Sequence, residues 1–343
     1  MKLRKITFLS LIIALISGCG GGEDNLTQTT TIPTQALAIT SANAQEVSSI
    51  ALSIAIEPIE SSETAINLIS VAQNETQTGQ INLILFARNQ LKWLDSSLIS
   101  NDDVNYSLAS ITTTPPQPNE SCNNSGTATI IFNDNNSDNN LSDGDAFSIS
   151  LNNCLINEDQ AVYNGNMLMT FDAITGDPVN DDIWDVAISF TFDNFSITST
   201  GGAASELSGD LNLTIGTEDT IVFTGTLSGN KLSYTTSNAP AELTDYLLTF
   251  YSDYNEKIYR HTIRGSLASA TLNGAFDITP ITFFEAHESA KPHLGTFRVT
   301  GANNSSVTIE AFSDASAVQL RVDNDGEGTT DHTINTTWDA LAL

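Results

Sequence analysis

From about residue 120 to the C-terminus, apolar and polar side chains alternate with a period of two. In the segment VAISFTF (186–192), every second residue from Val186 to Phe192 is large and apolar, and the residues between them are Ala, Ser and Thr. This alternation is typical of an antiparallel sheet with one buried face. Three further segments repeat it, with apolar or glycine positions at Leu207, Gly209, Leu211, Leu213 and Ile215; at Ile221, Phe223, Gly225 and Leu227; and at Val318, Leu320 and Val322.

Turn-forming residues separate these segments at regular intervals, for example SGN at 228–230 and GANNSS at 301–306. No stretch with helical periodicity interrupts the strands after residue 120. Regular short strands joined by turns favour a meander. The sequence therefore predicts a mainly β fold over residues 121–343, an antiparallel meander forming a large sheet, a sandwich or an open barrel.

The region 43–110 has a different pattern, with apolar residues at helical spacings. We expect a small, mainly helical N-terminal segment there, although INLILF (81–86) also fits a buried strand. Pro58 must end or kink a helix that reaches it. Residues 111–120 include three prolines and predict a linker before the β domain.

The N-terminus has the layout of a secretory signal. A basic start, with Lys2, Arg4 and Lys5, precedes an apolar run that is too short to span a bilayer stably. The sequence predicts a signal peptide at 1–18 and a flexible tether at 19–42.

The ending Ile-Ser-Gly-Cys (16–19) resembles the lipobox of bacterial lipoproteins. The resemblance implies cleavage before Cys19, its diacylation and a third acyl chain (palmitate-type) on the new amino group. Gly20 after the cysteine resembles the class destined for the outer membrane of Gram-negative bacteria, facing the periplasm or the cell surface. An ordinary signal peptide is the alternative. Several acyl chains anchor a protein stably where one is marginal.

Charge limits the partners of the mature chain. Removing residues 1–18 takes away three of the twelve Lys and Arg residues and none of the 41 Asp and Glu residues, which leaves a formal net charge of −32. Such a chain repels nucleic acid and anionic lipid, and attracts cations or basic partners. Solubility outside the cytoplasm is the simpler explanation of the charge.

Two cysteines remain after Cys19. An isolated pair in an oxidising compartment is most simply a disulfide, here Cys122–Cys154, and a thiol metal site or a catalytic cysteine is the alternative. Residue 138 is the midpoint of the pair, so a hairpin folding back around that point brings the two cysteines together.

The stretch FNDNNSDNNLSDGDAF (132–147) surrounds that midpoint and fits a calcium-loop pattern. It resembles the loops of EF-hands and dockerins over twelve residues, although position 6 is Asn139 where such loops have glycine and the flanks alternate as strands. An Asx-rich turn without an ion is the alternative. The predicted Ca²⁺ ligands are Asp134, Asn136, Asp138, Asn140 and Asp145, with Ser142 at the ninth position.

A second loop, VDNDGEGTTD (322–331), places Asp323, Asp325, Glu327 and Asp331 in a D-x-D-x-E pattern, with Ile334 where a twelfth-position acid would stand. The sequence predicts either structural Ca²⁺ or a plain turn here. The C-terminal segments GTFRVTGANNSSVTIEAF and VQLRVDNDGEGTTDHTINTTWDAL are similar to the endings of uncharacterised proteobacterial lipoproteins, with Trp338 near the end. That resemblance implies membership of such a family but no activity.

Catalytic and nucleotide-binding motifs are missing from the sequence. His287 and His293 in HESAKPH read as surface histidines, and the aromatic cluster around Tyr246 and Tyr259 as core. We therefore expect a non-enzymatic, membrane-anchored protein with an envelope structural or binding role. An open-barrel carrier of a lipid or other amphiphile, lined by residues such as Phe190, Phe192 and Leu211, is the alternative.

Overall fold

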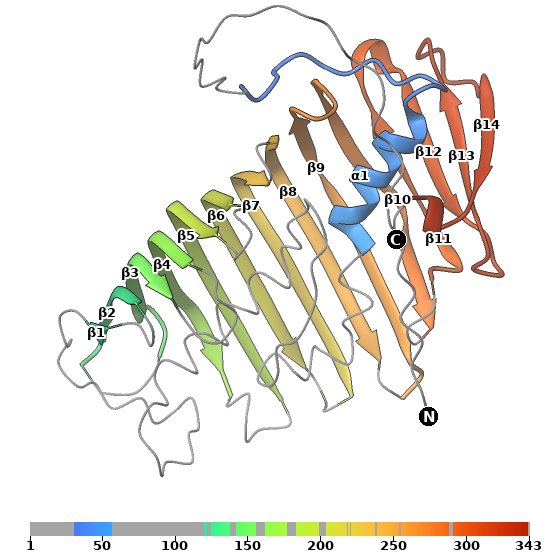
Figure 1. The fold of residues 1–343 in the computed structure, drawn as a ribbon. Helices are drawn as coiled ribbons and strands as arrows, with labels where there is room; N and C mark the ends of the chain where they lie inside the picture. Colours follow the sequence, from blue (N-terminus) through green and yellow to red (C-terminus); the bar gives the residue numbers. More distant parts are fainter. Residues whose placement is uncertain are drawn as a thin grey trace, which may run out of the picture.

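The chain folds around one antiparallel sheet whose strands follow one another in sequence order (Figure 1). The computed structural model describes residues 31–56, 120–121, 125–137, 142–155, 162–176, 183–198, 204–217, 219, 221–236, 239–253, 255–287 and 291–341. The 14-stranded sheet has β1 at one edge and β14 at the other, and it is not closed. The predicted mainly β meander is confirmed in the form of a single open sheet.

The elements have the following bounds. The helix α1 spans Ala44–Ile56, and the 3₁₀ turns are η4 (Ala302–Asn304) and η5 (Asp339–Leu341). The strands are β1 (Glu120–Ser121), β2 (Ser125–Asn133), β3 (Ala146–Leu155), β4 (Val162–Thr175), β5 (Trp184–Thr198), β6 (Ala204–Thr217), β7 (Val222–Thr236), β8 (Ala239–Asp253), β9 (Ile258–Ser269), β10 (Gly274–His287), β11 (Leu294–Thr300), β12 (Ser306–Ala311), β13 (Val318–Asp323) and β14 (His332–Thr336).

One face of the sheet, here called the inner face, holds the core. The alternation in VAISFTF is confirmed, because Val186, Ile188, Phe190 and Phe192 are all buried. The register aligns such residues from strand to strand, and each large apolar side chain contributes about 1.5–3 kcal/mol when it is fully buried. One such row across β4–β9 consists of Phe171, Ile188, Leu213, Leu227, Leu248 and Ile263.

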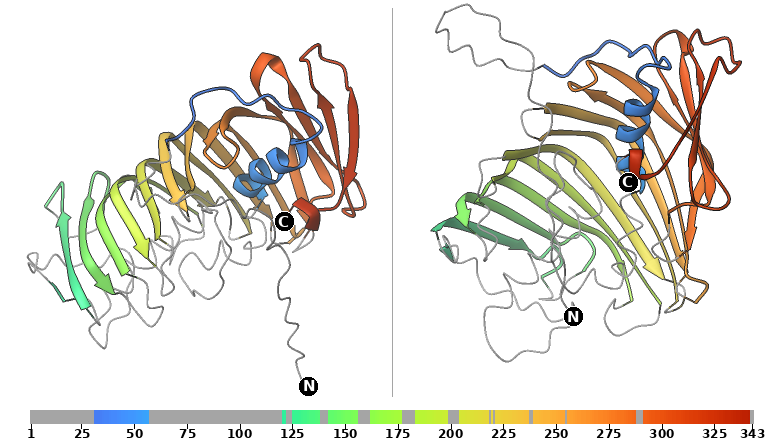
Figure 2. Two further views of the ribbon diagram at one scale, coloured as in Figure 1. Left: turned by 45° about the horizontal axis from the view of Figure 1, so that its top comes forward. Right: turned by 45° about the vertical axis from the view of Figure 1, so that its right-hand side comes forward.

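β-Bulges recur along the sheet and bend it. The pairing shifts at Asn164–Asn166 in β4 and at Phe192–Phe195 in β5. These two bulges adjoin each other, since Gly165 has φ +99° and approaches the carbonyl oxygen of Asn194 closely. A bulge adds local twist and curvature to its strand. The views in Figure 2 show the resulting curved sheet, with α1 on the inner side.

The segment before the helix packs on the sheet and corrects the predicted tether. Ala36 forms a parallel bridge with Ala275, and the Leu37 amide donates to the Ala275 carbonyl at 2.8 Å. Ile39 is fully buried, and its amide donates to Ser305 Oγ at 2.9 Å. The chain is thus fixed to the sheet before residue 42, where the prediction still placed a flexible tether.

α1 covers part of the inner face. Its buried residues Val47, Ala51 and Leu52 belong to the core, and the helix contacts β9, β11, β12, β13 and η5. The described part of α1 reaches Ile56, and Pro58 lies outside the described residues. The predicted helical segment to residue 110 and the linker at 111–119 otherwise lie outside the described residues, as do the signal peptide and Cys19.

Candidate functional site

The first acidic loop, between β2 and β3, is organised around a buried carboxylate. Asp145 is fully buried, and its Oδ1 accepts a hydrogen bond from the Asn135 amide at 2.8 Å. Its Oδ2 accepts from the Ser142 amide at 2.7 Å and from the Ser142 hydroxyl at 3.2 Å. Asp145 therefore closes the turn by binding backbone amides, as Asx side chains do without a metal.

The other predicted calcium ligands of this loop are only partly described. Asp134 Oδ1 accepts from the Ser137 amide at 2.6 Å, and Asn136 Nδ2 donates to Ser142 Oγ at 2.9 Å. Asp138 and Asn140 lie outside the described residues. Within the described part of this loop, Asp134 and Asp145 do not join a group of three metal-type ligands.

The second acidic loop, between β13 and β14, brings three of its four predicted ligands together. The carboxylates of Asp323, Asp325 and Asp331 offer oxygens that lie within 4.8 Å of one another. Glu327 is not in this group. Three converging carboxylates are a donor set that suits a hard cation such as Ca²⁺.

The same carboxylates also hold the turn through backbone amides. Asp323 Oδ1 and Oδ2 accept from the Gly326 and Gly328 amides, both at 2.8 Å. Asp331 Oδ2 accepts from the Asn324 amide at 2.8 Å. The loop thus has an internal hydrogen-bond framework, and calcium here stays a prediction.

Cys154 lies in β3, is fully buried and is disulfide-bonded. Its predicted partner Cys122 lies outside the described residues. The neighbouring register fits the predicted pair, since Ser121 pairs with Thr127 and Thr127 with Asn152. The identity of the partner remains a prediction.

His261 in β9 is buried at 2 % exposure on the inner face, and neither ring nitrogen has a hydrogen-bond partner. Its ring stacks on Phe284 with centroids 5.6 Å apart. Burial lowers the pKa of His261 from 6.5 to about 3. The side chain is therefore a neutral core residue at neutral pH.

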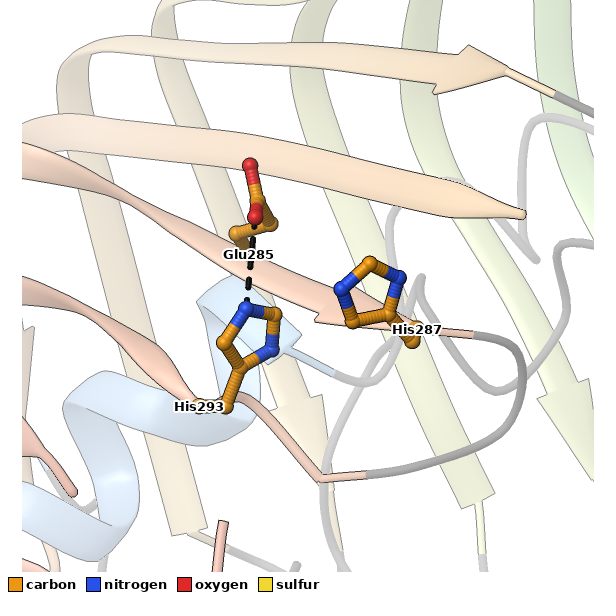
Figure 3. A group of neighbouring side chains, drawn as sticks. All are labelled: Glu285, His287 and His293. Carbon is orange, nitrogen blue, oxygen red and sulfur yellow. Dashed lines mark ion pairs between the residues drawn. The ribbon is translucent and has the colours of Figure 1, made fainter. Parts of the chain in front are cut away.

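Glu285, His287 and His293 come together at the end of the β10–β11 hairpin (Figure 3). Their metal-type ligand atoms lie within 4.8 Å of one another. Sequence reasoning treated both histidines as unconnected surface residues. A predicted hairpin here could have indicated the group. Glu285 and His287 are two residues apart in one strand and therefore share a face, and a strand that returns after the turn brings His293 beside Glu285.

Serine, threonine, asparagine and acidic side chains make up the polar face, here called the outer face, over β4–β8, and most of its charged groups are acidic. Residues 162–253 contain thirteen Asp and Glu residues and one basic residue, Lys231. Lys231 is paired with Glu242 at 2.5 Å. The carboxylates at outward-facing positions of these strands are those of Asp172, Asp185, Asp193, Glu206, Asp210 and Glu242.

Tyr246 is a core residue that lies beside one of these acidic residues, Asp210. Its hydroxyl donates to the Asp210 carbonyl at 2.6 Å. Burial, with the nearby Asp210 charge as the smaller cause, raises the pKa of the Tyr246 phenol. Tyr246 is buried at 3 % exposure, and Tyr259 is buried as well, so both fill core positions as the sequence suggested.

Comparison with known protein families, curated proteins and solved structures finds no match to this chain. Within the described residues, no helix has the length and hydrophobicity required to cross a bilayer.

Proposed function

We propose that this chain is a lipid-anchored protein of the bacterial outer membrane that acts by binding, not by catalysis, and that the acidic outer face of β4–β8 binds a cationic partner. The observation that carries the proposal is the charge of residues 162–253, a segment whose described carboxylates include Asp193 and Glu206 on that face. Thirteen acidic residues stand against Lys231 alone over residues 162–253, and the mature chain has a formal net charge of −32.

The other half of the sheet differs in charge. Six of the seven basic residues from 120 onward lie between residues 257 and 321, and several are paired with carboxylates. Arg260 contacts Glu285 at 2.7 Å, and Arg321 contacts Glu310 at 2.8 Å. A cationic partner is therefore attracted to β4–β8 more strongly than to β9–β13.

The different composition of the two faces indicates which face of the sheet contacts the partner. The inner face of β4–β8 holds the apolar core, so the outer face is the one that presents polar and charged side chains to a partner. The lipobox-like segment ending at Cys19 supports the membrane anchor, and the expected location follows from it.

Titration with a lysine-rich peptide tests this proposal. The variant Asp193→Asn/Glu206→Gln removes two exposed carboxylates of the acidic half, and the control Asp277→Asn/Glu310→Gln removes two from β10 and β12. We expect the first variant to bind roughly fivefold more weakly, because two exposed ion pairs at about 0.5 kcal/mol each contribute about 1 kcal/mol together. The control should bind as the wild type does. Equal loss in both variants would contradict a site on β4–β8.

A second candidate function is carriage of a lipid or other amphiphile on the inner face. The supporting observation is the large number of apolar side chains on the inner face of β3–β8; Phe190 and Leu211 are buried there, so a ligand would have to enter between packed side chains. Solvent extraction of the purified chain followed by mass spectrometry tests it. A stoichiometric lipid other than the acyl chains of Cys19 supports a carrier, and its absence from chain purified in a mild detergent counts against one.

A further inference from the structure

We propose that Glu285, His287 and His293 form a binding site for a divalent transition metal of the zinc class. This site is separate from the acidic face of β4–β8 and from the two loops predicted to bind calcium. It rests on the positions of the three side chains in the β10–β11 hairpin.

The hairpin fixes the backbone of the site. Glu285 pairs with Leu294 across the two strands, and the His293 amide donates to the Glu285 carbonyl at 2.9 Å. Glu285 and His287 lie two residues apart in β10 and project from the same face. The three ligands therefore come from both sides of one hairpin, whose backbone is hydrogen-bonded between Glu285 and His293.

Two of the ligand atoms are already at the separation that a bound ion needs. His293 Nε2 lies 3.3 Å from Glu285 Oε1. Two ligands of a tetrahedral zinc ion, each about 2.0–2.1 Å from the metal, are about 3.3 Å apart. A metal thus fits between His293 and Glu285 without a backbone shift.

The side chain of His287 must rotate before it can become the third ligand of the metal. The His287 and His293 rings are stacked, with centroids 4.7 Å apart and planes 11° apart (Figure 3). Ring nitrogens in nearly parallel planes do not converge on one ion, so one ring must turn. His287 is the exposed ring, and the side chain of His293 is only 24 % exposed. Because His287 is exposed to solvent, water can supply the fourth ligand, as in zinc sites with three protein ligands.

Arg260 holds the carboxylate in place. Its Nε donates to Glu285 Oε2 at 2.7 Å, which leaves Oε1 to face the histidines. The guanidinium lies over the rings of Tyr251 and Phe283, at 5.2 and 5.1 Å from their centroids. Hydrogen bonds to a ligating carboxylate orient it, although the Arg260 charge also lowers the affinity for a cation.

The donor chemistry selects the metal class. Two imidazoles and one carboxylate suit Zn²⁺, Ni²⁺ or Cu²⁺, whereas Ca²⁺ and Mg²⁺ prefer all-oxygen sites. The acidic loop of Asp323, Asp325 and Asp331 has only oxygen ligands. The two groups are therefore expected to differ in metal preference.

Calorimetric titration of Zn²⁺ into the full-length chain, purified in detergent, tests the proposal. We expect one ion per chain, and about tenfold weaker binding or worse for His287→Ala and for His293→Ala. His287 is exposed, so its truncation tests the site even if His293→Ala is poorly folded. The matched controls are His332→Ala, an exposed histidine of β14, and Asp325→Asn in the acidic loop, which should bind Zn²⁺ as the wild type does.

Substitution of Co²⁺ for Zn²⁺ provides a second readout, because the visible absorption of bound Co²⁺ reports nitrogen and oxygen ligation directly. The spectrum should change in both histidine variants and not in the controls. Unaltered Zn²⁺ affinity in His287→Ala and His293→Ala, or an equal loss in His332→Ala, would overturn the proposed site.

Discussion

At the scale of single residues, buried polar groups in this protein fall into two kinds. Asp145 is fully buried and its carboxylate is satisfied by two backbone amides and a hydroxyl. His261 is equally buried, and its two ring nitrogens have no partner. A satisfied buried carboxylate stabilises the fold, whereas unpaired nitrogens cost about 1–3 kcal/mol.

Asp145→Ala should lower the free energy of unfolding by about 3 kcal/mol or more, because hydrogen bonds to a charged group are worth about 1.5–3 kcal/mol each and two amides lose their acceptor. Urea unfolding measures the change. Asp314→Ala is the matched control, since Asp314 also accepts from a nearby backbone amide, that of Ser316, but is exposed. A loss at Asp145 no larger than at Asp314 would contradict the structural role of the buried carboxylate.

His261 should make the protein less stable in acid. In the unfolded chain its pKa is near 6.5, and in the folded chain burial lowers it to about 3. Between these values only the unfolded state takes up the proton, so stability is complete above pH 6.5 and falls as the pH drops toward 3. At pH 5 the loss from this residue is about 2 kcal/mol.

The comparison of wild type and His261→Phe by urea unfolding at pH 7.5 and pH 5 measures this loss. The phenylalanine cannot be protonated and can stack on Phe284 as the imidazole does. We expect a smaller drop in stability between the two pH values for the variant. An identical drop would assign the acid sensitivity to other groups.

At the scale of elements, the strand pattern was predictable and the bulges were not. Period-two alternation placed Ile188, Phe190 and Phe192 on one face, because the polarity of each residue can be read directly from the sequence. The shift that returns Phe195 to the same face depends on Asn194 at φ 51° and on the neighbouring Gly165, which no local pattern connects. The packing of Ala36 against Ala275 of β10 and of Ile39 against Ser305 was also missed, because these contacts join residues more than 200 positions apart.

Gly165 tests the contribution of these bulges to the sheet. Its φ is +99°, and a Cβ there would lie 2.2 Å from the Asn194 carbonyl oxygen. Gly328 also has positive φ, +89°, but a Cβ there would meet nothing within 4 Å. Gly328→Ala should therefore cost about 1–2 kcal/mol for the backbone conformation alone.

Gly165→Ala should cost clearly more than Gly328→Ala, because it adds a steric clash with β5 to the same conformational penalty. Thermal unfolding of both variants provides the comparison. Equal melting temperatures would mean that the close approach of β4 and β5 is easily relaxed.

The β13–β14 loop tests the calcium prediction. The D-x-D-x-E pattern predicted four carboxylates, and three of them converge at Asp323, Asp325 and Asp331. Ca²⁺ at about 100 times its dissociation constant should add about 2.7 kcal/mol to the free energy of unfolding. Asp325→Asn, which retains the shape of the side chain, should reduce that gain, and a melting temperature insensitive to both Ca²⁺ and chelator would rule the loop out as a calcium site.

At the scale of the whole molecule, the sequence predicted a large β meander but left open whether it forms one sheet, a sandwich or a barrel. The alternation shows that one face of each strand is buried, which all three arrangements require. The choice among them depends on curvature accumulated over many bulges and on the position of α1. The His287–His293 pair was missed for a related reason: its significance depends on the hairpin register, which sets Glu285 opposite Leu294.

For the molecule as a whole, we propose that an open sheet with an acidic outer face is attached to the outer membrane through Cys19. Metabolic labelling with an alkyne analogue of palmitate, followed by fractionation of the cells, tests this attachment most directly. The wild type should be labelled and recovered in the outer membrane. Cys19→Ser should be unlabelled and absent from that fraction, with an unchanged melting temperature because residue 19 precedes every described element. An unlabelled wild type, or label that persists in Cys19→Ser, would contradict the account.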